Sequence, residues 1–155
     1  MLSPGQKAPA FTLFSSDKKE VSLAGFENKN LIILFFPMAF TSVCTAELCE
    51  VRDNISTYAG LNADVVGISV DSPFTLARFK EEQNLPFDLL SDFNKDVSQA
   101  YGAYYDTFVM NMKGVSKRAA FVVDQQGIIQ YAEVLDNAGE VPSFQAIQET
   151  LSTLK

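Results

Sequence analysis

The sequence of 155 residues has no histidine, no tryptophan and only two cysteines, Cys44 and Cys49. Without histidine, Ser-His and Cys-His catalysis are both excluded. A zinc site built on two cysteines would lack its other usual ligands, so we expect no metal site. Two cysteines in a chain without a secretory signal are more often catalytic than structural, which favours a reducing, cytoplasmic compartment.

Positive charge and long apolar runs are also scarce. The 12 basic residues are outnumbered by 19 acidic ones, and the net charge is −7. The sequence has no cluster of lysine or arginine that would form a basic surface, so we expect neither a nucleic-acid partner nor a membrane partner. The longest apolar run is too short to span a bilayer, and the first residues lack the pattern of a signal peptide.

What the chain does contain is enough apolar sequence for one compact domain over residues 1–155. The residue pattern predicts an N-terminal hairpin at 11–14 and 21–23, and further strands at 31–36, 64–70, 87–90, 119–123 and 128–135. Helices are expected at 42–59, 73–83, 94–101 and 141–154. This order predicts an α/β fold with a mixed central sheet flanked by helices, the thioredoxin-like layout with an extra N-terminal β-hairpin.

Cys44 is the residue that points most clearly to chemistry. It follows the six apolar residues 31–36 and Pro37, at the start of the helix predicted over 42–59. A helix start offers free backbone N–H groups and a partial positive charge, and both stabilise an anion. An ordinary thiol is only ~3% ionised at pH 7, and mostly thiolate character requires a shift worth roughly 3.4 kcal/mol. Because a helix terminus supplies ~2 kcal/mol at most, a partner cation is needed.

Arg118 is the best candidate for that cation, because it opens the strand 119–123, which should lie beside the strand 31–36. Thr41, three residues before Cys44, offers a hydroxyl as a helix cap or as a hydrogen-bond partner. Pro37 would rigidify the loop and shield the sulfur from water. Glu47 lies one turn after Cys44, where it could hold Arg118 through a bidentate pair.

Each of these residues also has a plainer interpretation. A lone cysteine on an apolar helix face is usually a small core residue, and the pair Lys117 and Arg118 would ordinarily be solvated. Pro37 could be only a strand stop, Thr41 only a cap and Glu47 only an acid suited to the helix dipole. The conjunction favours an anion site, because all the parts fall where one such site requires them.

The run Phe35-Phe36-Pro37-x-x-x-Thr41-x-x-Cys44-x-x-Glu47, with the distant Arg118, resembles the active-site signature of the peroxiredoxins, the cofactor-independent thiol peroxidases. The resemblance covers nearly the whole chain, including the opening segment 5–13 and the segments 68–73, 89–92 and 118–124. The chain is similar to two branches of the family, the alkyl hydroperoxide reductase E type and the peroxiredoxin Q or bacterioferritin comigratory protein group.

The resemblance implies that Cys44 attacks a peroxide and becomes a sulfenic acid, with Pro37, Thr41 and Arg118 lining the pocket. It implies no cofactor, a peroxide substrate, and thioredoxin or a similar thiol as reductant.

Cys49 stands at the spacing from Cys44 at which the peroxiredoxin Q group resolves the sulfenic acid as an internal disulfide. Five residues on an ideal helix place the two Cα atoms about 8.6 Å apart, and a disulfide needs less than about 7 Å. The bond therefore requires the first turns of the helix to unwind. Otherwise Cys49 is an ordinary helix residue, and an outside thiol resolves Cys44.

Two other functions remain open from the sequence. A thioredoxin-like disulfide oxidoreductase would generally use Cys-x-x-Cys, which is absent. A non-catalytic redox-sensing module or holdase would keep Cys44 merely buried. Phe40 and Phe108, apolar residues expected to be exposed near the active-site loops, suggest a homodimer interface.

Overall fold

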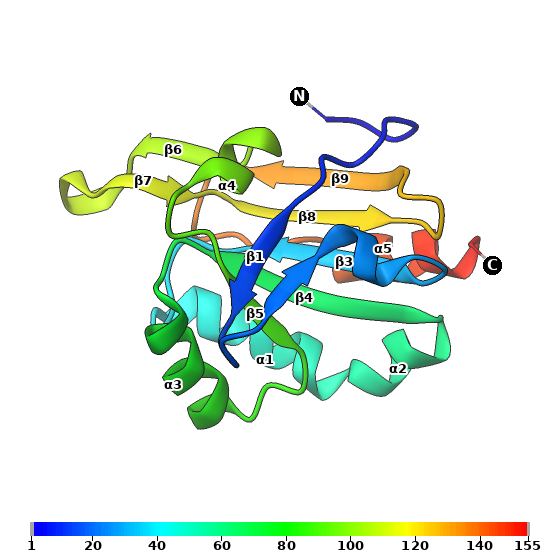
Figure 1. The fold of residues 1–155 in the computed structure, drawn as a ribbon, viewed down its shortest axis with the longest axis horizontal. Coiled ribbons are helices and arrows are strands. Elements are labelled where there is room, and N and C mark those ends of the chain that lie inside the picture. The colour runs from blue at the N-terminus through cyan, green and yellow to red at the C-terminus, as the bar shows by residue number, and fades with distance from the viewer. Residues whose placement is uncertain (1, 155) are drawn as a thin grey trace.

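The structure is a computed structural model that describes residues 2–154. A seven-stranded sheet forms its centre, in the order β2-β1-β5-β4-β3-β8-β9 (Figure 1). The strands are β1 (Thr12–Ser15), β2 (Glu20–Ser22), β3 (Asn30–Phe35), β4 (Ala63–Ser69), β5 (Asp88–Ser91), β8 (Arg118–Val123) and β9 (Ile129–Leu135). A separate two-stranded sheet, β6 (Tyr104–Thr107) and β7 (Lys113–Ser116), extends from one end of the molecule.

The central strand β3 determines where the candidate site lies. All six of its residues are buried, as expected for a strand covered on both faces. It pairs in parallel with β4 and antiparallel with β8, with Phe35 opposite Ala119. Since the strands run in opposite directions, the end of β3 meets the beginning of β8. This register brings Arg118 to the loop that follows β3.

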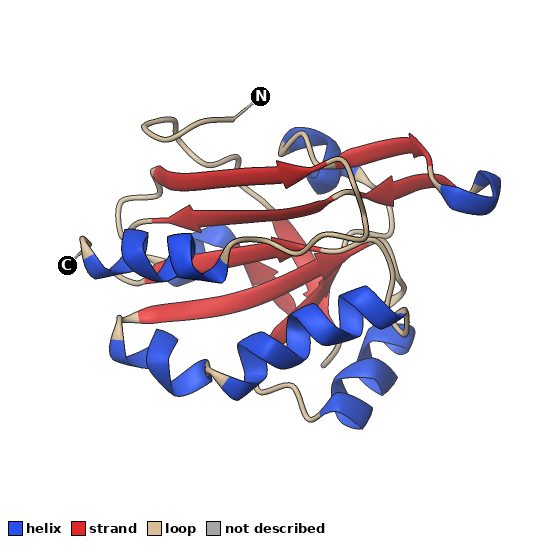
Figure 2. Cartoon of the chain, turned by 180° about the vertical axis from the view of Figure 1, so that it is seen from behind, coloured by secondary structure: helices blue, strands red, loops and turns tan. Residues whose placement is uncertain are grey.

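Helices cover the sheet in two layers. The helices α1 (Ser42–Asp53), α2 (Ile55–Gly60), α3 (Pro73–Gln83) and α5 (Phe144–Ser152) pack on one face (Figure 2). The short helix α4 (Asp96–Ala100) and the segment before β1 pack on the other. Alternate residues of β3 enter the two cores, with Leu34 in the first and Ile33 in the second, as a pleated strand requires.

The predicted fold is confirmed, including the N-terminal hairpin of β1 and β2 and the pairing of β3 with β8. The single helix predicted over 42–59 is wrong, because the chain breaks into α1 and α2 at Asn54. The Asn54 side-chain amide donates to the Glu50 carbonyl at 2.8 Å, and such a local bond competes with helix continuation.

The β6–β7 hairpin was not predicted, because its short strands alternate little and enclose the 3₁₀ turn η2 (Val109–Asn111). Phe108 lies beside this turn, half-buried against the ring of Tyr105 with 5.1 Å between centroids, and so is less exposed than expected. Residues 2–154 contain no helix that combines the length and the hydropathy of a membrane span.

Candidate active site

Cys44 lies in the first turn of α1, which begins at Ser42 after the N-cap residue Thr41. Its side chain is only 1% exposed. The free N–H groups of the first turn and the positive end of the helix dipole both favour negative charge at this position. The structure therefore places the sulfur where a buried anion would be stabilised.

The guanidinium of Arg118 contacts the sulfur of Cys44. Its Nη2 lies 3.2 Å from Sγ, although the two residues are 74 positions apart in the sequence. Arg118 is itself only 1% exposed. A cation at this distance and away from water would stabilise a negative charge on the sulfur with little screening. The predicted meeting of Cys44 with Arg118 is thus present in the structure.

Two further contacts fix the orientation of the guanidinium. Nη1 donates to Glu47 Oε1 at 2.7 Å, and Nη2 also donates to the backbone carbonyl of Ala138 at 2.9 Å. Ala138 lies in the loop between β9 and α5. Its role was not predicted, because a backbone carbonyl carries no signal in the sequence.

Glu47 holds Arg118 through one oxygen, so the expected bidentate pair is wrong. Its side chain is fully buried, and Oε2 has no hydrogen-bond partner within residues 2–154. Burial raises the pKa of Glu47 to about 7, even though the charge of Arg118 acts in the opposite direction. An acid that titrates near neutrality therefore shares the guanidinium with the thiol.

Pro37 and Thr41 lie on the loop between β3 and α1. Pro37 is buried, whereas Thr41 is exposed. The Thr41 hydroxyl donates to the Met38 carbonyl at 2.8 Å and makes no side-chain cap bond to the helix. Thr41 thus occupies the N-cap position as expected, but its hydroxyl is turned toward the loop.

A residue that sequence reasoning missed, Asp71, holds this loop. The Ala39 N–H donates to Asp71 Oδ2 at 2.8 Å, and the Ser69 hydroxyl donates to the same oxygen at 2.7 Å. The neighbouring Phe40 adopts a left-handed φ of 69°, a conformation that is strained for a bulky residue. The only available signal was the position of Asp71 just after the predicted strand 64–70.

Cys49 lies on a different side of α1 from Cys44. It is half-buried, and its thiol donates to Gln83 Oε1 of α3 at 3.3 Å. Arg52 binds the backbone carbonyl of the same glutamine at 2.6 Å. Both cysteines are free, and α1 runs unbroken between them. The structure does not bring the two sulfurs together.

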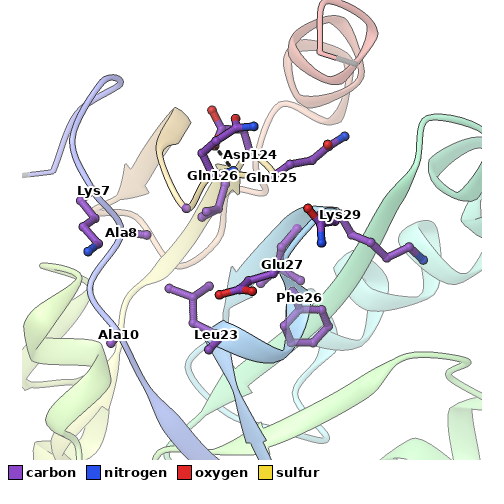
Figure 3. A pocket seen from close by; sticks show the side chains of 15 residues that line it. Lys7, Ala8, Ala10, Leu23, Phe26, Glu27, Lys29, Asp124, Gln125 and Gln126 are labelled. Atoms are coloured by element: carbon purple, nitrogen blue, oxygen red, sulfur yellow. Dashed lines mark hydrogen bonds between the residues drawn. The ribbon is translucent and has the colours of Figure 1, made fainter.

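A separate pocket of about 420 Å³ lies at the opposite ends of β3 and β8, lined by Leu31 and Val123. Figure 3 shows Leu23, Phe26 and Glu27 on one side of it and the turn Asp124–Gln126 on another. Cys44 and Arg118 do not line this pocket. The thiol site is therefore distinct from it.

Comparison with known proteins points to the family that the active-site signature resembles. The profile of the AhpC/TSA family matches residues 4–132. A Mycobacterium tuberculosis protein described as a peroxiredoxin is 43% identical over 134 residues, with 85% of each chain covered. Alkyl hydroperoxide reductase E of Mycobacterium bovis is 36% identical, with 99% of each chain covered.

Solved structures agree as well. A peroxiredoxin-like protein from Aquifex aeolicus superposes with a TM-score of 0.88 at 26% identity, over 99% of this chain and 88% of the other. Peroxidoxin BcpB from Mycobacterium tuberculosis has a TM-score of 0.88 over 100% and 99% of the two chains; at 24% identity this likeness supports the fold alone.

The thioredoxin-like fold and the family match together define a thiol-dependent oxidoreductase. More particularly, the chain belongs to the AhpC/TSA family, the peroxiredoxins. It is a thiol peroxidase, and its family reduces peroxides with the help of thiol reductants.

The raised pKa of Glu47 has a consequence for stability. The folded state binds a proton at Glu47 more tightly than the unfolded state does, so stability falls as pH rises from about 4.5 to about 7. Relative to Glu47→Gln, we expect the wild type to lose up to ~3 kcal/mol of unfolding free energy across this window.

Urea denaturation of both proteins at several pH values measures this difference. Glu50→Gln, which changes an exposed acid of the same helix, serves as the control and should show no such trend. A wild-type advantage that stays constant or grows with pH would contradict the burial of an ionisable Glu47.

Proposed function

We propose that Cys44 is the peroxidatic cysteine and that Arg118 keeps it as a thiolate. The observation that carries the proposal is the 3.2 Å contact between Arg118 Nη2 and Cys44 Sγ in a site closed to water. The helix start supplies part of the stabilisation that a thiolate needs, and the buried guanidinium supplies the remainder. Glu47 and the Ala138 carbonyl act by fixing the guanidinium in place.

The reaction follows from these positions. The Cys44 thiolate attacks the terminal oxygen of a hydroperoxide, so an S–O bond forms while the O–O bond breaks. The sulfur becomes a sulfenic acid, and the second peroxide oxygen departs as an alkoxide or hydroxide that gains a proton to give an alcohol or water. Pro37 excludes water, and Thr41 with Arg118 orients the peroxide oxygens; a turn of the Thr41 hydroxyl from Met38 toward the substrate would bring it into range.

Cys49 is proposed as the resolving residue. Its thiol attacks the sulfenic sulfur, an S–S bond forms and water leaves; thioredoxin or a similar dithiol then reduces the disulfide. Because α1 is intact and Cys49 is bound to Gln83, the first turns of α1 must unwind before the sulfurs meet. The alternative is a one-cysteine peroxidase in which an external thiol attacks Cys44 directly.

The remaining proposals concern partners and location. Phe40 is 48% exposed and packs on Phe79 with 5.2 Å between ring centroids. We place the proposed homodimer contact at this exposed ring, beside the active-site loop. The cytoplasmic location predicted from the cysteine content stays a prediction.

Arg118→Lys tests the thiolate proposal. An ammonium keeps the positive charge but cannot bridge Cys44, Glu47 and Ala138 in the same plane. We expect the rate constant for oxidation of Cys44 by peroxide, measured by rapid mixing, to fall about 10- to 100-fold, the loss of one charge-assisted hydrogen bond. Arg78→Lys, at an exposed arginine of α3, should leave the rate unchanged. An unaltered rate in Arg118→Lys would refute the role of the guanidinium.

Cys49→Ser tests the resolving step. After one equivalent of peroxide, the wild type should show an internal disulfide by mass spectrometry, whereas Cys49→Ser should stop at the Cys44 sulfenic acid. Cys44→Ser should show neither product. A wild-type protein that accumulates the sulfenic acid and forms no internal bond would favour the one-cysteine scheme.

Phe40→Asp tests the dimer contact. A buried carboxylate at an apolar interface is strongly unfavourable, so the variant should sediment as a monomer at concentrations where the wild type is a dimer. Analytical ultracentrifugation over a range of concentrations gives the answer. A wild type that stays monomeric at high concentration would end the proposal.

A further inference from the structure

Glu47 can carry a proton, and the proposed reaction does not yet use it. Its Oε1 accepts from Arg118 at 2.7 Å, while its buried Oε2 has no hydrogen-bond partner among residues 2–154. An ionised carboxylate with a bare buried oxygen is costly, because nothing replaces the water that this oxygen has lost. A protonated carboxyl avoids most of that cost. The environment thus favours a proton on Glu47, in agreement with its raised pKa.

The thiolate and the carboxylate compete for one cation. Nη1 of Arg118 faces Glu47 and Nη2 faces Cys44, at 2.7 Å and 3.2 Å. A single guanidinium compensates one buried negative charge well, but two anions beside it repel each other. Two anions on one guanidinium are disfavoured, so a negative charge on the sulfur favours a proton on Glu47.

Other charges do not disturb this pair. Apart from the ionised sulfur of this scheme, Arg118 is the one charged side chain that acts on Glu47 within the described residues. The charged groups of α1, α3, α5 and β9 near this layer lie toward the surface or are paired elsewhere: Glu50, Arg52, Arg78, Lys80, Glu81, Glu82, Glu133 and Glu149.

We propose that Glu47 and Cys44 hold one proton between them through Arg118, and that Glu47 releases it when peroxide oxidises the sulfur. The inference rests on the proposed role of Cys44 as the peroxidatic thiolate. Glu47 is a positioning residue in this scheme, because it contacts Arg118 and not the peroxide. Glu47 is protonated while the sulfur is a thiolate and ionised once the sulfur is a sulfenic acid, so the net charge around Arg118 stays the same.

The proton balance follows from the reaction. The thiolate attacks the peroxide, the S–O bond forms, the O–O bond breaks and an alkoxide or hydroxide departs. The neutral sulfenic acid no longer needs the charge of Arg118, so the guanidinium now favours ionised Glu47. The proton that Glu47 loses equals the proton that the departing oxygen gains. The oxidation therefore takes no net proton from the solvent, by whatever route the proton travels.

Proton uptake during a single turnover tests this balance. The test uses the full chain with Cys49→Ser, which stops at the sulfenic acid, with and without Glu47→Gln. The reduced proteins are mixed with one equivalent of hydrogen peroxide in lightly buffered, slightly alkaline solution that contains a pH indicator, because Glu47 beside a neutral sulfur is ionised only above about pH 7. Glu50→Gln in the same background is the matched control.

We expect no proton uptake with Glu47 present and uptake of one proton per sulfur in Glu47→Gln, because glutamine has no proton to give. Uptake of one proton in both proteins would overturn the inference and leave the thiolate role of Cys44 standing. No uptake in either protein would mean that Cys44 begins as a neutral thiol, which would overturn the proposed function and this inference with it.

An infrared difference spectrum of the wild-type chain provides a readout that needs no folded variant. Oxidation by peroxide should remove the carbonyl band of a protonated carboxylic acid and add a carboxylate band. A spectrum without loss of the protonated carboxyl would contradict the release of a proton from Glu47.

Discussion

The candidate site depends on one buried guanidinium. Arg118 is almost fully removed from water, and it contacts the sulfur of Cys44, the carboxyl of Glu47 and the carbonyl of Ala138. Burying an arginine is unfavourable unless its donors and its charge are matched. The partners of Arg118 provide that match, and in doing so they fix the cation that contacts the thiol. The proposed chemistry and the packing of the core therefore depend on the same side chain.

The sheet is what makes this arrangement possible. Antiparallel pairing of β3 with β8 places Phe35 opposite Ala119, so that the residue before Ala119 reaches the start of α1. Asp71, which follows the neighbouring strand β4, holds the loop between β3 and α1. Three neighbouring strand ends thus position the sulfur, its cation and the loop beside them. Local unwinding of α1 would leave this sheet-based frame in place while the helix changes shape.

The central strand, the helix start and the candidate cation could be predicted, because each is marked by a short stretch of sequence. The unbroken apolar run 31–36 marks a central strand, and Pro37 with Cys44 marks the helix start. Arg118 could be chosen because it opens a second apolar strand. The contact with Ala138 could not be predicted, since it involves a backbone carbonyl whose position depends on the packing of a loop.

The errors have similar causes. Asn54 divides the expected long helix through a side-chain bond to Glu50, and nothing in the apolar periodicity reveals that bond. Thr41 occupies the N-cap position, but its hydroxyl donates to the Met38 carbonyl and its oxygen accepts no N–H of the helix, an orientation set by the path of the loop. The single-oxygen contact of Glu47 depends on side-chain orientation within the core, which is set by tertiary packing.

The proposed chemistry requires the sulfur of Cys44 to be an anion beside Arg118. The most direct measurement is the ultraviolet thiolate absorbance of the reduced Cys49→Ser protein as a function of pH. We expect one thiolate to be present already in neutral solution. A thiolate signal that appears only in alkaline solution, as for a free cysteine, would contradict it.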